Sequence, residues 1–149
     1  MNNNTTSLHH KDLELHLFRS LESELNLSTT KKITRIVRIV LTSVMERMPE
    51  TNVNETIQKL PSTLQLIFKG NWKSHDHHDP VLHLDELVEN VCKEGDANST
   101  KLFSNEVEAL ESVLIVIKNL KIIFDKIGVI VFPYSLINEY QQALQENTV

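Results

Sequence analysis

Hydrophobic residues recur at helical spacing along most of the chain, and this pattern predicts an all-α protein. Leu13, Leu17, Leu21 and Leu25 lie four residues apart, so they share one face of a helix expected from about Leu8 to Leu27. A second helix follows Ser28-Thr29-Thr30 and ends at Pro49. Its broad apolar face consists of Ile33, Ile36, Val37, Val40, Leu41, Val44 and Met48. Two long amphipathic helices are therefore expected in the first third of the chain.

The middle of the chain predicts shorter helices divided by turn residues. Val53, Ile57 and Leu60 have helical spacing, and Pro61-Ser62 then opens another helix that stops at Gly70. Residues 71–80 form the longest polar stretch of the interior and predict a loop. A short amphipathic helix follows and ends near Gly95.

The most apolar segment covers residues 105–127 and ends at Gly128. Its apolar residues are spread around nearly the whole helix circumference, which predicts a helix at the centre of a bundle. A strand is the alternative at Val113–Ile117 and at Val129–Phe132, because both runs are rich in β-branched residues. Helix is favoured at the first run, since 105–126 contains no Gly or Pro and is too long for a strand. If the chain has a strand, we expect it at Val129–Phe132.

These elements predict a single-domain bundle of about six or seven helices. Residues 1–7 are polar and uncharged and predict a disordered tail, which leaves residues 8–147 as the helical domain. A chain of 149 residues has the length of one ordinary domain. Each half has a long apolar helix followed by a shorter amphipathic one, a pattern that is typical of two related halves, here joined near residues 95–102.

Charge and cysteine content limit the classes of partner. The chain has 15 basic and 20 acidic residues, a net charge of −5, so nucleic acid is not an expected partner. Lys118 and Lys121 interrupt the most apolar segment, so a membrane span is not expected either.

The N-terminal residues do not resemble a secretory signal, and we expect a cytoplasmic protein. Cys92 is single and predicts a buried or half-buried structural thiol.

One cluster of side chains has metal-ligand chemistry. Imidazole and carboxylate groups together suit a divalent transition metal. The candidate ligands are His75, His77, His78, Asp79 and His83. The alternative is a solvated polar loop in which Asp79 and Pro80 start the following helix, and this interpretation is favoured because nothing in the sequence fixes a ligand geometry. No catalytic motif and no cofactor-binding motif occurs, so an enzyme is unsupported.

The run from Ile57 to Trp72 contains Leu60-Pro61-Ser62 at a helix start, then an apolar helix, then Gly70 and Trp72. This pattern resembles the bacterial family known as domain of unknown function 2267, over about residues 33 to 92. The resemblance implies a helical bundle and a bacterial cytoplasmic protein, and it brings no established activity or site residues.

The sequence therefore leaves two functional hypotheses. The favoured one is a small non-enzymatic interaction or regulatory protein that associates with another protein or with itself. The alternative is a metal-binding protein that uses the loop from His75 to His83. An exposed apolar patch of several hundred Å² would favour the first hypothesis.

Overall fold

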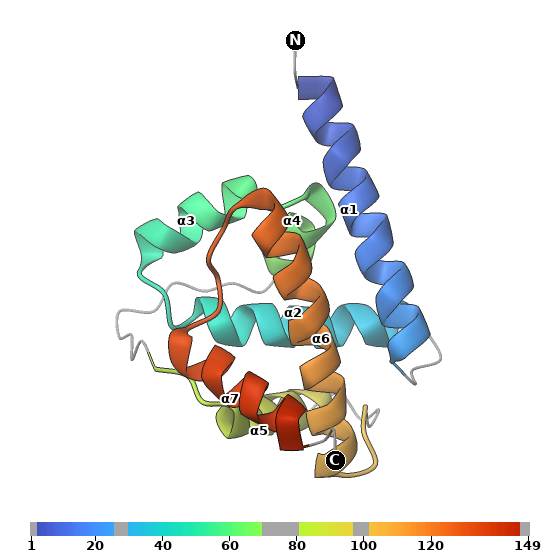
Figure 1. The fold of residues 1–149 in the computed structure, drawn as a ribbon, viewed down its shortest axis with the longest axis vertical. Helices are drawn as coiled ribbons and strands as arrows, with labels where there is room; N and C mark the ends of the chain where they lie inside the picture. Colours follow the sequence, from blue (N-terminus) through green and yellow to red (C-terminus); the bar gives the residue numbers. More distant parts are fainter. Residues whose placement is uncertain (1–2, 26–29, 70–80, 97–101, 147–149) are drawn as a thin grey trace.

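The computed structural model describes residues 3–25, 30–69, 81–96 and 102–146, and within these ranges it contains seven helices and no strand (Figure 1). The all-α prediction is therefore confirmed. The helices, in chain order, are α1 (Asn3–Glu24), α2 (Thr30–Met45), α3 (Glu50–Lys59), α4 (Ser62–Lys69), α5 (Leu84–Asp96), α6 (Glu106–Ile127) and α7 (Tyr134–Glu146).

Helices α2 and α6 cross at the centre of the bundle and contact each other (Figure 1). Helix α6 also contacts α1 and α5, and α2 also contacts α1, α4 and α5. Val113, Val116 and Leu120 of α6 are fully buried, as are Ile36 and Val40 of α2. The central position predicted for residues 105–127 is confirmed, and α2 shares that position.

Local signals in the sequence fix both ends of α6. Asn105 precedes the helix, and its side-chain oxygen accepts a hydrogen bond from the backbone N–H of Glu108 at 2.9 Å. Gly128 follows the helix in the left-handed conformation, with φ of 78°. The backbone N–H of Val129 then donates to the carbonyl of Phe124 at 3.0 Å, which satisfies a helix-end carbonyl.

The connection from α6 to α7 is not a strand, so the strand alternative at Val129–Phe132 does not hold. The burial nevertheless alternates: Val129 and Val131 are 8% and 4% exposed, whereas Ile130 is 89% exposed. The ring of Phe132 lies 5.6 Å from that of Phe124 between centroids. The buried side chains of Val129 and Val131 therefore attach the connection to the core. Within the described residues no strand lies beside it to complete a sheet.

The first helix begins earlier than the sequence predicts. Residues 3–7, expected to be a disordered tail, belong to α1, whose N-terminal end projects beyond the rest of the bundle (Figure 1). This segment has no Gly or Pro, so it can continue a helix that packing stabilises further along. Within the predicted junction at 95–102, residues 97–101 lie outside the described ranges.

None of the helices in the part of the chain that the structure describes is both long enough and apolar enough to cross a membrane.

Candidate binding groove

Helices α5, α6 and α7 enclose an open groove with a volume of about 870 Å³. In Figure 1 these helices lie together at the lower end of the bundle, where the start of α6 approaches the end of α7. We call this feature the acidic groove. The described residues that line it are Leu84, Asp85, Val88, Glu89, Cys92, Lys93, Glu106, Val107, Leu110, Glu139, Gln142, Ala143 and Glu146.

The floor of the acidic groove is apolar because apolar residues of its helices extend beyond the faces that are buried in the core. On α5, Leu87 and Val91 are fully buried, and the next residues, Val88 and Cys92, are turned by about 100° and line the groove. On α6, Val107 is 65% exposed although it is a large aliphatic residue. The groove therefore presents a concave apolar surface that no described part of the chain covers.

The rim of the acidic groove is negatively charged. Among the described residues that line it, five carboxylates come from all three helices and Lys93 is the one basic side chain. Lys93 pairs with Glu89 on the same helix at 3.2 Å. Glu106 and Glu146, by contrast, have no ion pair within the described residues. The groove is thus an apolar floor bordered by an excess of negative charge.

Near the lining residues Leu84 and Glu139, α7 contacts the segment that leads into α5. The Nδ1 atom of His83 lies 2.6 Å from Oε1 of Glu139, and the backbone N–H of Leu84 donates to the other carboxylate oxygen at 3.4 Å. Ser135 donates its hydroxyl to the carbonyl of Leu82 at 3.0 Å. The hydrogen bond to Glu139 is the main reason why the pKa of His83 is raised above its ordinary value.

The same segment is also attached to the centre of the bundle. Arg47, just after α2, donates to the carbonyl of Val81 at 3.1 Å and to the carboxylate of Glu86 at 2.9 Å. The start of α5 is therefore held from two sides, by α7 and by the end of α2. This arrangement fixes one wall of the groove relative to the core.

The structure places one residue of the predicted metal cluster and leaves the metal site a prediction. His75, His77, His78 and Asp79 lie outside the described residues, and of the five candidates only His83 is placed. Among the residues that the structure does describe, no group of three His, Cys, Asp or Glu side chains could hold a metal ion. The Glu139 partner of His83 is 56 residues away in sequence, so no local motif could have indicated it.

The leucine-proline pattern at the start of α4 has a structural role. Leu60 is 2% exposed and Pro61 is also buried. The Gln65 side chain donates to the Leu60 carbonyl at 2.8 Å, and its backbone N–H donates to the Pro61 carbonyl at 3.0 Å. These bonds fix the turn that leads into α4. Gly70 and Trp72 lie outside the described residues.

These features define a helical bundle protein with an open, acidic groove. The chain belongs to a family of uncharacterized conserved proteins, domain of unknown function 2267 (DUF2267), whose model matches residues 16–120. The match is wider than the 33–92 range in which the sequence shows the resemblance, and it ends within α6, so α7 lies beyond it. Comparison with curated proteins and with solved structures gives no match.

Proposed function

We propose that this chain is a small, non-enzymatic interaction protein that binds a segment of a protein partner in the acidic groove. The observation that carries the proposal is the uncovered apolar floor, on which Val107 is 65% exposed. Burial of apolar surface stabilises a complex by about 25 cal/mol per Å² before the costs of association are subtracted. A partner that covers this floor therefore gains binding free energy.

Two variants test the proposal. Val107→Asp places a charge on the groove floor, and an acidic residue in the first turn of α6 is compatible with the helix. Leu66→Asp is the matched control, because Leu66 is 75% exposed on α4 and does not line the groove. In a quantitative pull-down from the native host, we expect a partner that wild type and Leu66→Asp retain and Val107→Asp loses. Equal recovery by all three proteins would contradict the proposal.

A second candidate function is binding of a divalent transition metal by the segment from His75 to His83. One observation favours it: a carboxylate holds Nδ1 of His83, while the side chain remains 49% exposed, so that Nε2 can face a ligand. Histidines that bind metals commonly donate their other ring nitrogen to a carboxylate in this way. In this hypothesis Glu139 orients His83, and His75, His77, His78 and Asp79 provide further ligands.

Metal analysis of untagged, purified protein tests the second candidate. We expect stoichiometric metal in the wild type, and none after combined substitution of His75, His77 and His78 by Ala. Glu139→Gln should weaken metal binding by roughly 10- to 100-fold. His16→Ala, which removes an exposed imidazole from α1, is the control. Protein isolated from its host without metal would rule this candidate out.

We also infer a bacterial cytoplasmic setting, in keeping with the family resemblance.

A further inference from the structure

We propose that the occupant of the acidic groove is a short, basic amphipathic helix of a partner protein. This inference rests on the proposed function and specifies the chemistry of the partner. Such a helix has aliphatic residues on one face and Lys or Arg on both flanks. Its apolar face covers the groove floor, and its basic side chains pair with the carboxylates of the rim.

Charge complementarity is the first argument. The described residues that line the groove include five carboxylates and one ammonium group, so the rim attracts cations and repels an acidic segment. Glu106 at the start of α6 and Glu146 at the end of α7 have no ion pair within the described residues. Both carboxylates can therefore pair with a partner without breaking an ion pair within the bundle.

The distribution of polarity across the groove is the second argument. Lys and Arg have apolar stems and charged ends, so they can lie along an apolar floor and still reach a polar rim. Val88, Cys92 and Ala143 are half-buried floor residues, and Glu89 and Glu146 are exposed carboxylates on the same two helices. A basic amphipathic helix can cover the apolar floor and pair with the carboxylates of the rim at the same time.

The dimensions of the groove suit a helix of limited length. The α5 wall runs from Leu84 to Lys93, which corresponds to about 14 Å at the rise of an α-helix. A partner helix of roughly ten residues covers this distance, and it presents apolar side chains at i, i+3 or i+4, and i+7. The groove is therefore matched to a short recognition helix.

A second copy of this chain is a poorer fit for the groove. The basic residues Lys31, Arg35 and Arg38 lie along α2, at the spacing of one helical stripe. However, Ile33, Ile36 and the other apolar residues of that helix are buried in the bundle. Helix α2 therefore cannot supply both the charge and the apolar face, and we assign the occupant to a different protein.

Designed peptides test this inference on the full-length protein. The probe is a helical peptide of about 14 residues, roughly four turns, with Leu on one face and Lys on the flanks. A second peptide has Glu in place of every Lys, and a third has the Leu and Lys residues in scrambled order. Binding is measured by calorimetry, and the site is located by amide chemical shifts. We expect only the first peptide to bind, with shifts confined to α5, α6 and α7.

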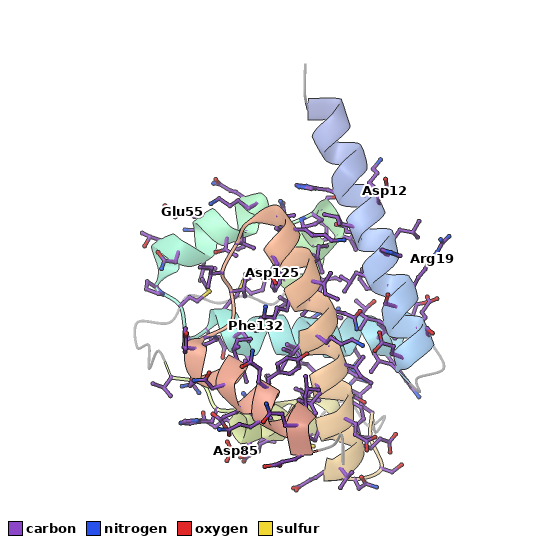
Figure 2. All side chains as sticks on the ribbon, viewed as in Figure 1. Asp12, Arg19, Glu55, Asp85, Asp125 and Phe132 are labelled. Carbon is purple, nitrogen blue, oxygen red and sulfur yellow. The ribbon has the colours of Figure 1, made fainter. Side chains whose placement is uncertain are left out.

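Charge variants decide whether binding uses the rim. Glu106→Lys should weaken binding of the Lys peptide by about two- to fivefold, which is the contribution of one exposed ion pair. Lys93→Glu removes the basic side chain of the rim and should strengthen binding by a similar factor. That increase cannot result from misfolding. Glu55→Lys is the matched control, because Glu55 is exposed on α3, far from Asp85 and the groove (Figure 2).

The outcomes separate this inference from the proposed function. If the Glu peptide binds the groove as tightly as the Lys peptide, the basic partner is wrong and the groove remains a binding site. If no peptide shifts the groove amides and Val107→Asp loses no partner in the pull-down, both proposals fall. The inference would also be overturned if the Lys peptide bound Glu106→Lys and Lys93→Glu with the same Kd as wild type. So would a dimer in sedimentation experiments that Val107→Asp dissociates, because the occupant would then be a second copy.

Discussion

The carboxylate of Glu14 on α1 caps α4 by accepting a hydrogen bond from the backbone N–H of Thr63 at 2.8 Å. Pro61 precedes α4 and has no side-chain oxygen, so it cannot cap the first N–H groups itself. Glu14 is 7% exposed and comes from 49 residues earlier in the chain. A helix start that resembles a local signal in the sequence therefore depends on a distant acidic residue.

We predict that Glu14→Ala lowers the free energy of unfolding by about 1 to 3 kcal/mol, because it leaves a helix-start N–H without its charged acceptor. Urea denaturation followed by circular dichroism measures the change. Asp12→Ala is the control on the same helix, since Asp12 is exposed (Figure 2), and it should stay within about 0.5 kcal/mol of wild type. Equal effects of the two substitutions would argue against the cap.

The α6–α7 connection gives a second prediction. Phe132→Ala should lower the free energy of unfolding by roughly 3 to 5 kcal/mol, because it removes a 7% exposed ring that contacts Phe124. Ile130→Ala should change stability little, because Ile130 is 89% exposed. Thermal and urea unfolding of both variants measures the contrast. A large loss at Ile130 would show that the connection is packed differently.

Gly128 gives a third prediction. Its φ of 78° is unfavourable for residues with a Cβ atom, although nothing lies within 4 Å of where that atom would be. Gly128→Ala should therefore destabilise the protein by about 1 to 2 kcal/mol through the backbone alone. Gly128→Asn should cost less, because Asn tolerates the left-handed region better. Equal unfolding midpoints for wild type and Gly128→Ala would contradict the left-handed helix end.

The pair of His83 and Glu139 gives a prediction about pH. We expect NMR titration to place the pKa of His83 above its ordinary value of 6.5, because Glu139 accepts a hydrogen bond from the ring and adds negative charge. Glu139→Gln should lower this pKa. Glu146→Gln, on the same helix, is the control and should leave it unchanged. A pKa of His83 that is the same in wild type and in Glu139→Gln would count against the pair.

The effect of this pair on stability has a definite sign. The pKa of His83 is higher in the folded protein than in the unfolded chain, so folding favours the protonated ring. The contribution is therefore fully present below pH 6.5 and is lost as the pH rises through the folded-state pKa of His83. Unfolding of wild type and Glu139→Gln should differ most under mildly acidic conditions and converge as the pH rises.

The helical fold could be predicted because burial in this chain follows local periodicity. Leu13, Leu17 and Leu21 share a face in the sequence and are all buried in the structure. The start of α1 was harder to predict, because the polar residues 3–7 have no pattern that distinguishes a helix from a tail. Val129–Phe132 has the alternation of a strand. A strand must also pair with a neighbouring strand, and the sequence of the segment does not show whether one lies beside it.

The acidic groove could not be predicted from the sequence for a related reason. Val107 has the spacing of a core residue, and only the arrangement of three helices leaves it exposed. The same holds for His83, whose partner Glu139 is brought near by the packing of α7 on α5. The residue types of the metal cluster can be recognised in the sequence. His75, His77, His78 and Asp79, however, lie outside the described residues.

Helix α7 packs mainly against α5, and its buried residues are Leu136 and Tyr140. A helix held by few buried residues opens locally at a lower free energy than the centre of a bundle. Its backbone amides should exchange with deuterated water sooner than those of α2 and α6. A ligand in the groove contacts α7 together with α5 and α6, so it links this opening to binding and slows the exchange. Amide exchange along α7 therefore reports occupancy of the groove even before the partner is identified.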